Sequence, residues 1–393
     1  MEAVEAAVVG AGPAGLAAGA MLRRQGIDAV LLEKADEVGS SWRKHYDRLH
    51  LHTVRWLSGL PGFPIPRAFG KWVARDDVQR YLQAYAEHHR LDVRLRSEVQ
   101  GLRRSDGGWA ITTTAGALMA RSVVIATGYN RQRFIPQWSG RETFTGEFLH
   151  STGYRNASPY VGRSVLVIGT GNSGAEIAAD LVERGAGKVW LSVRTPPNIL
   201  RRDVAGLPTQ AIGILMRPLP VGVVDRLTKI VQHLTVGDLS PYGLGSPPRG
   251  MYRRLREDDI IPILDVGLIR AVKQRRVAVV ATVTGFDKGD VVLEGGQRIQ
   301  PDVVIAATGF RRGLETLLGS LGVLRPDGRP AVHGPLTHRN APELYFIGYS
   351  NPLSGNLREL GIDARRIAHE VARKRRRTGA RGRRSGVAAS ARR

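Results

Sequence analysis

Gly10-Ala11-Gly12-Pro13-Ala14-Gly15 decides the fold, because it places the spacing G-x-G-x-x-G between the apolar run Ala6-Ala7-Val8-Val9 and an alanine-rich helical stretch. In a strand–turn–helix unit such glycines allow a tight turn and let the backbone approach a pyrophosphate, whose charge lies at the helix N-terminus. The pattern recurs at Gly169-Thr170-Gly171-Asn172-Ser173-Gly174, after Val165-Leu166-Val167-Ile168. Two such units predict two nucleotide sites, and so electron transfer between two cofactors.

The strand expected after each fingerprint ends on a residue that can select the ribose. Glu33 ends the first, where a carboxylate accepts two hydrogen bonds from a diol; an ordinary polar strand end is the alternative. The matching position in the second unit is Arg194, whose guanidinium can pair with a 2′-phosphate. The first site therefore suits FAD and the second NADPH rather than NADH. Arg202 is a second candidate for the phosphate, although the whole chain is rich in arginine.

The chain has 393 residues and no cysteine, so it has no disulfide, thiolate metal site or thiol nucleophile. It also lacks the dithiol through which pyridine-nucleotide disulfide reductases pass electrons to their substrates. No apolar run approaches the roughly 20 residues of a transmembrane helix, and no basic, cleavable leader opens the sequence. We therefore expect a cytoplasmic protein without a transmembrane segment.

The formal net charge of +23 raises the possibility of a polyanion-binding protein. Fifty of the 58 basic residues are arginine, which is typical of a composition bias. Ten basic residues and no acidic one lie in residues 373–393, which have no apolar periodicity and are predicted to be a disordered, solvated tail. No stacking aromatic residues interleave the basic runs, so we expect no specific nucleic-acid partner.

Two further strands share an ending, since Val123–Gly128 and Val303–Gly309 each run into A-T-G and then an aromatic residue. The pattern predicts an α/β fold of two interleaved doubly wound (Rossmann-like) dinucleotide-binding domains, the second inserted into the first. The expected division is 1–160 for the first part of the FAD domain, 161–300 for the NADPH domain, 301–372 for the second part of the FAD domain and 373–393 for the tail. The stretch 204–250 fits neither unit; it either covers the active site or touches a membrane surface.

Phe144 to Tyr154 reads F-x-G-x-x-x-H-x-x-x-Y, which resembles the identifying sequence of the flavin-containing monooxygenases, or class B flavoprotein monooxygenases. In the related Baeyer–Villiger enzymes the last position of this motif is typically Trp. Tyr154 therefore favours the flavin-containing monooxygenases proper. The resemblance covers roughly 1–370 and is strongest to the YUCCA-type branch and its bacterial relatives at Tyr46–His52, Val193-Arg194 and Pro262–Gly267. Ser40 replaces a common glycine and Ile347–Gly355 departs from the plant pattern, which leaves the substrate open.

The resemblance implies that NADPH reduces FAD and that dioxygen then forms a flavin hydroperoxide, which gives one oxygen atom to a small organic substrate. That substrate is an amine or sulfide, or a 2-oxo acid such as indole-3-pyruvate, which is oxidatively decarboxylated. The cofactor carries this chemistry, so no catalytic side chain and no metal site is expected. An NADPH-dependent flavin oxidoreductase or oxidase is the alternative, but it gives no reason for the Phe144–Tyr154 motif. A homodimer is left open.

Cofactor contacts are expected from both fingerprints, both strand ends and the positions that the resemblance adds. The full set is Gly10, Gly12, Pro13, Ala14, Gly15, Glu33, Lys34, Trp42, His52, Val99, Thr127, Gly128, Gly169, Gly171, Asn172, Ser173, Gly174, Arg194, Arg202 and Gly309. Within the family motif, His150 is expected to position the linker and the nicotinamide nucleotide rather than to act as an acid or base.

Overall fold

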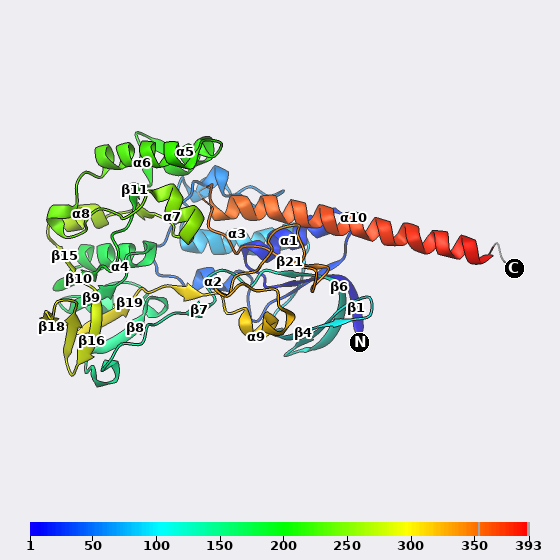
Figure 1. Ribbon diagram of the computed structural model, residues 1–393, viewed down its shortest axis with the longest axis horizontal. Helices are drawn as coiled ribbons and strands as arrows, with labels where there is room; N and C mark the ends of the chain where they lie inside the picture. Colours follow the sequence, from blue (N-terminus) through cyan, green and yellow to red (C-terminus); the bar gives the residue numbers. More distant parts are fainter. Residues whose placement is uncertain (353, 391–393) are drawn as a thin grey trace.

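A computed structural model describes residues 1–352 and 354–390, with side chains through residue 377, and has two sheets side by side, the first mixed and the second all parallel (Figure 1). The first sheet has the order β3 (Asp92–Arg94), β2 (Ala29–Leu32), β1 (Glu2–Val9), β6 (Gly116–Ile125), β5 (Gly108–Thr113) and β4 (Val99–Ser105), with β21 (Leu344–Phe346) also paired to β6. The helices of this part are α1 (Pro13–Arg24), α2 (Ser40–Arg43), α3 (Arg75–His88), α9 (Glu315–Leu318) and α10 (Asn356–Ser390).

The centre of the first sheet is parallel and buried on both faces, as its apolar strand sequences demand. Ala6 to Val9 of β1 are all buried, and Val8 lies opposite Leu31 of β2 on one side and Val124 of β6 on the other. Helices α1 and α10 pack against one another and bury the alanine and leucine side chains of α1. The fingerprint turn is therefore held between a rigid strand and a rigid helix.

The second sheet repeats this plan with β15 (Val277–Val280), β10 (Lys188–Ser192), β9 (Ser164–Ile168), β19 (Val303–Ala306) and β8 (Glu147–His150), all parallel. Helices α4 (Asn172–Glu183) and α8 (Leu268–Lys273) pack on one face, and the antiparallel strands β16 (Val283–Asp287), β17 (Asp290–Leu293) and β18 (Arg298–Ile299) on the other. Each A-T-G strand neighbours its own fingerprint strand, β6 beside β1 and β19 beside β9. The predicted fold class, two interleaved dinucleotide-binding domains, is confirmed.

The second sheet extends beyond the range 161–300 expected for it. Strand β8 precedes residue 161 and β19 follows residue 300, yet both hydrogen-bond within this sheet. The expected boundary at residue 300 assigns β19 to the first domain, whereas its pairing with β9 makes it the counterpart of β6 in the second. The chain crosses between the units at β7 (Gln132–Arg133) and β20 (Phe310–Arg311), which pair antiparallel. We keep the four-part division as a proposal, with β8 and β19 moved to the second domain.

Residues 199–265 form a helical insertion on the second domain. It consists of β11 (Ile199–Arg201), β12 (Asp203–Val204), β13 (Leu207–Pro208), α5 (Thr209–Met216), α6 (Val221–Thr235), α7 (Met251–Asp258) and β14 (Ile263–Asp265). Strands β11 and β14 pair in parallel and tie the insertion down, while α5 and α6 lie on the outer edge of the molecule (Figure 1).

The expectation of a disordered tail from residue 373 is wrong for its described part. Helix α10 continues through Ser390 and projects from the body of the molecule (Figure 1), and residues 391–393 lie outside the described residues. Its first basic residues are engaged: Lys374 Nζ is 3.1 Å from Glu343 Oε1, and Arg375 Nε is 3.0 Å from Glu5 Oε1. Arginine, lysine and alanine are good helix formers, so a packed helix continues into the basic stretch.

Candidate functional site

The first fingerprint turn is shaped by two glycines that admit no side chain. Gly10 has φ +108°, and a Cβ there would lie 2.7 Å from the carbonyl oxygen of Ala126. A Cβ on Gly15 would lie 1.9 Å from the carbonyl oxygen of Gly10. A Cβ on Gly12, by contrast, would meet nothing within 4 Å. Gly10 and Gly15 are therefore required by the fold, whereas the space at Gly12 is open for a ligand.

The second turn has the same geometry. Gly169 has φ +111° and would place a Cβ 2.5 Å from the oxygen of Ala307, and Gly174 would place one 2.0 Å from the oxygen of Gly169, while the space at Gly171 is open. Neither α1 nor α4 receives a side-chain cap from the described part of the chain. The first-turn N–H groups are thus available to an anion. Both turns fit the pyrophosphate of a dinucleotide.

Glu33 lies at the end of β2 and is 8% exposed. Its Oε2 accepts a hydrogen bond from the N–H of Ala11 (2.7 Å), inside the fingerprint, and its Oε1 accepts one from the N–H of Ala35 (2.9 Å). A carboxylate oxygen has a second lone pair, so each can still accept from a hydroxyl. The structure therefore brings the predicted ribose acceptor to the turn, while the neighbouring Lys34 is exposed.

The remaining positions predicted around the first turn occupy different environments. Pro13 is the first residue of α1, Ala14 and Val99 are buried, and Trp42 of α2 is partly buried against the core of this domain. Thr127 donates its N–H to the Tyr349 hydroxyl (3.2 Å) and lies 2.8 Å from it through Oγ1; burial raises the pKa of Tyr349 to about 12. Thr127 and the open glycine Gly128 thus lie at the exit of β6.

In the second unit, Arg194 follows β10, is exposed and has no ion-pair partner among the described residues, as a phosphate ligand requires. Asn172 is committed to the fold, because its amide donates to the oxygen of Pro262 (3.2 Å) and accepts from the N–H of Leu264 (2.9 Å). Arg202 stacks on Trp72 with 4.3 Å between the guanidinium and the ring centroid, and burial lowers its pKa. Ser173 contacts the Tyr46 hydroxyl, whose pKa burial raises.

Helix α4 presents an acidic face to the first domain that sequence reasoning missed. Glu176, Asp180 and Glu183 recur at the four- and three-residue spacing that places them on one face. Glu176, 3% exposed, bonds to Nε2 of the predicted His52, and Asp180 accepts from the Tyr154 hydroxyl (2.6 Å). Arg48 is 3.0 Å from Glu183. The signal was available, since charged residues at this spacing interrupt an otherwise apolar helix.

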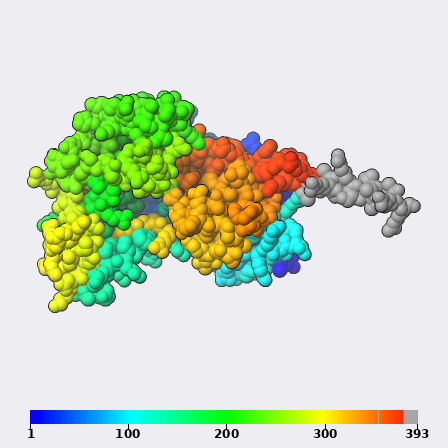
Figure 2. Space-filling model, viewed as in Figure 1, coloured from blue at the N-terminus to red at the C-terminus, as the bar shows by residue number. Residues whose placement is uncertain are grey.

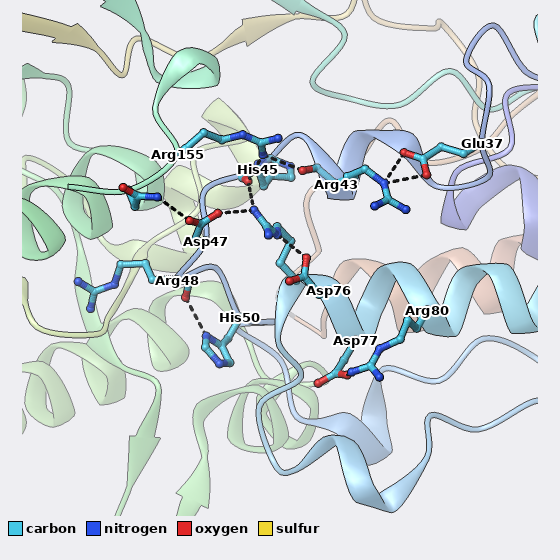
Figure 3. A network of polar contacts seen from close by, with 12 residues as sticks. Glu37, Arg43, His45, Asp47, Arg48, His50, Asp76, Asp77, Arg80 and Arg155 are labelled. Carbon is cyan, nitrogen blue, oxygen red and sulfur yellow. Dashed lines mark hydrogen bonds and ion pairs between the residues drawn. The ribbon is translucent and has the colours of Figure 1, made fainter. Parts of the chain in front are cut away.

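The segment that holds His52 is fixed by a polar network at the joint between the domains (Figure 3). Asp47 accepts from Arg75 Nη1 (2.8 Å) of α3 and from the amide of Asn156 (2.7 Å), which lies between β8 and β9 of the second domain. Arg155, in the same segment, donates to the carbonyl oxygens of Arg43 and His45, each at 2.7 Å. The Tyr46–His52 segment and residues 155–156 therefore position one another.

The Phe144–Tyr154 motif makes packing and hydrogen-bond contacts that connect elements of the fold. Phe144 packs edge-on against Phe286 at 5.4 Å, and Tyr154 is fully buried. The Nδ1 of His150 accepts from the N–H of Thr152 (3.2 Å), so the hydrogen-bond network assigns the proton to Nε2, which donates to the carbonyl oxygen of Gly309 (3.1 Å). Burial lowers the pKa of His150 and favours this neutral form. His150 thus ties β8 to the exit of β19.

The two units face each other across a hollow. Figure 2 shows it between the green part of the chain and the orange part, with blue atoms of the N-terminal segment at its bottom. In the described part of the chain, no group of three or more His, Cys, Asp and Glu residues is arranged to hold a metal ion. No helix of the described residues combines the length and apolar character needed to cross a membrane.

Residues 7–202 match the family model described as pyridine nucleotide-disulphide oxidoreductase. The chain is 34% identical over 351 residues to an indole-3-pyruvate monooxygenase, YUCCA1, of Oryza sativa subsp. japonica, covering 88% of this chain and 86% of the relative. It is 31% identical over 378 residues to a probable indole-3-pyruvate monooxygenase, YUCCA3, of Arabidopsis thaliana, covering 93% and 86%. The absence of cysteine shows that the dithiol chemistry named in the family model is not shared.

Among solved structures, a flavin monooxygenase from Stenotrophomonas maltophilia, a variant with two substitutions, superposes with a TM-score of 0.74 at 28% identity over 95% of this chain and 99% of that one. A cyclohexanone monooxygenase superposes with a TM-score of 0.73 at 19% identity, over 96% and 89%, which shows the shared fold. The cofactors of this family are FAD and NADPH, the pair predicted from the two fingerprints. The chain belongs to the class B flavin monooxygenases and is a flavin-dependent oxidoreductase.

Proposed function

We propose that this protein is an NADPH- and FAD-dependent monooxygenase that oxidatively decarboxylates a 2-oxo acid such as indole-3-pyruvate. The observation that carries the proposal is the identity of 30–34% to several indole-3-pyruvate monooxygenases, each match covering about nine-tenths of this chain. The balanced reaction consumes the 2-oxo acid, dioxygen, NADPH and a proton. It yields the acid shorter by one carbon, carbon dioxide, water and NADP⁺.

In this proposal the first fingerprint holds FAD, with the pyrophosphate over Gly12 and the ribose at Glu33. The open space at Gly12 and the buried carboxylate bonded to Ala11 support that placement. The second fingerprint holds NADPH, with the pyrophosphate over Gly171 and the 2′-phosphate at Arg194. When bound, the reduced flavin supplies the activation of dioxygen, while the chain binds, orients and excludes water.

Substrate analysis tests the proposal. The FAD-loaded protein is incubated with NADPH and indole-3-pyruvate, and indole-3-acetate, NADPH consumption and hydrogen peroxide are measured together. The assay is run with and without catalase, because released hydrogen peroxide itself decarboxylates a 2-oxo acid. We expect indole-3-acetate to form in proportion to the NADPH consumed in both. If only an amine or sulfide is oxygenated, the decarboxylation is wrong but the monooxygenase stands. If NADPH yields hydrogen peroxide alone with every substrate class, the protein is an oxidase.

We also propose that the protein is located in the cytoplasm.

A further inference from the structure

Helix α6 presents a row of apolar side chains to solvent. On α6 these are Val223, Leu227, Ile230 and Leu234, which recur at helical spacing and are 45%, 41%, 51% and 77% exposed. Leu215 near the end of α5 and Leu219 in the loop before α6 are also exposed, at 80% and 40%. These six residues are called the α5–α6 apolar surface below. Single exposed apolar residues need no explanation, but a continuous row marks an interaction site.

The core of the insertion does not need this surface. The adjoining face of α6, about a quarter turn from the row, packs inward, where Val224 is 2% exposed and lines a small apolar cavity of about 50 Å³ with Val231, Leu200 and Met251. The apolar stripe of α6 is therefore wider than the part that the fold covers. The exposed apolar row on α6 is therefore available to contact another molecule or a lipid surface.

The exposed charged side chains of residues 207–236, the α5–α6 hairpin, are all positive. Residues 207–236 hold the basic residues Arg217, Arg226 and Lys229 and a single acidic residue, Asp225. Asp225 is half-buried, and its carboxylate accepts the N–H of Tyr252 (2.6 Å), so it faces inward. Arg226 and Lys229 are exposed beside the apolar row. With a chain net charge of +23, the complementary surface is anionic.

The shape of the hairpin favours a lipid surface over a protein partner. Helices α5 and α6 lie on the outer edge of the molecule, and in the space-filling view the profile of this edge shows no notch (Figures 1 and 2). A second copy would bring two basic faces together, which electrostatic repulsion opposes. A bilayer accepts protruding apolar side chains without a complementary shape, and anionic headgroups neutralise the flanking cations.

We propose that the α5–α6 apolar surface rests on membranes that contain anionic lipids. The six apolar side chains enter the headgroup–acyl boundary, and Arg226 and Lys229 extend to the phosphate groups. Helix α6 lies in the plane of the interface and does not cross the bilayer. The association is peripheral and reversible, and it weakens as the salt concentration rises.

Flotation of the FAD-loaded full chain with vesicles tests this proposal. One set of vesicles is phosphatidylcholine alone, and the other is phosphatidylcholine mixed with phosphatidylglycerol. We expect binding to the mixed vesicles only. The triple variant Leu227→Gln, Ile230→Gln, Leu234→Gln should abolish it, and Arg226→Gln with Lys229→Gln should weaken it by about fivefold for each charge removed. The matched control Val161→Gln with Leu336→Gln changes two side chains that are 59% and 63% exposed elsewhere and should bind as the parent does.

The outcomes separate the lipid surface from its rivals. Flavin content and melting temperature must be unchanged in the triple variant, which shows that the fold is intact. If the intact triple variant still floats with the mixed vesicles, helix α10 or another basic region carries the binding and the proposal is wrong. Equal binding to phosphatidylcholine alone, or no binding to either set, also overturns it. A dimer in light scattering that the triple variant disrupts, without vesicle binding, would assign the surface to a second copy.

Discussion

Gly12 and Gly15 show how single residues of one motif can serve different purposes. A Cβ on Gly15 would collide with the backbone of Gly10, whereas one on Gly12 would enter open space. We therefore predict that Gly12→Ala folds normally but loses FAD, because its methyl group occupies the place of the pyrophosphate. Gly15→Ala, the control, should lower the melting temperature itself. Flavin absorbance and thermal melting of both variants check this; a yellow Gly12→Ala protein would show that the open space is not the phosphate site.

Arg194 is the residue predicted to select the nicotinamide cofactor. A charge-assisted hydrogen bond to phosphate contributes about 1.5–3 kcal/mol, or roughly 10- to 100-fold in affinity. Arg194→Ala should raise the KM for NADPH within that range and leave the KM for NADH nearly unchanged. Arg184→Ala, an exposed arginine at the end of α4, is the matched control and should change neither. An equal rise for both cofactors would contradict recognition of the 2′-phosphate.

His150 should contribute a pH-dependent part of the stability. Its pKa is lowered from 6.5 by burial, so the unfolded chain binds the proton more readily than the folded one. The stability from its neutral form is present above pH 6.5 and is lost as the pH falls below that value. His150→Asn should therefore flatten the fall in melting temperature between about pH 7 and pH 5. His338→Asn, outside the motif, is the control; an unchanged slope in His150→Asn would show that the imidazole does not titrate with unfolding.

At the scale of secondary-structure elements, the contacts of helix α10 decide how far along the chain the stably folded part extends. Cutting after Val371, the end of the fold expected from the sequence, would remove the contacts of Arg373, Lys374 and Arg375 with Glu370, Glu343 and Glu5. Exposed ion pairs contribute up to about 1 kcal/mol each, so that cut should lower the melting temperature by roughly 2–4 °C.

A cut after Arg377 should leave melting, FAD content and NADPH oxidation unchanged and reduce retention on a heparin column. Because the ten basic residues from 373 onward include five beyond Arg377, the retention should also become less sensitive to salt. Loss of FAD after this shorter cut would show that the end of α10 supports the flavin site.

The elements that local sequence determines could be predicted, and those that depend on distant partners could not. Both fingerprint turns, both A-T-G strands and the positive φ of Gly10 follow from spacing within a few residues, whereas the ribose contact of Glu33 stays a prediction. The membership of β19 in the second sheet depends on its pairing with β9 and β8, which no local pattern encodes. The helical conformation of 373–390 reflects propensity outweighing charge repulsion, a balance that composition alone does not decide.

At the scale of the molecule, the two domains are joined by residues whose contacts could be identified only from the three-dimensional structure. Glu176 is buried against His52 of the first domain, and Asp180 lies 3.5 Å from Arg48 of the first domain while it accepts from Tyr154 of its own domain. His52 was predicted as a cofactor contact, and its bond to Glu176 of α4 adds that it links the two nucleotide-binding units. The acidic face of α4 and residues 155–156 of the second domain thus hold the Tyr46–His52 segment of the first domain.

Oxygen transfer, the central claim of this account, is tested most directly by isotope labelling. The FAD-loaded protein is supplied with NADPH, indole-3-pyruvate and dioxygen labelled with oxygen-18, and the acid product is analysed by mass spectrometry. A monooxygenase places one labelled atom in the carboxylate of indole-3-acetate and the other in water. Catalase is present, because free hydrogen peroxide itself decarboxylates a 2-oxo acid and leaves one of its oxygen atoms in the product acid. Loss of the labelled product in the presence of catalase, while NADPH is still consumed, would contradict oxygen transfer by this protein.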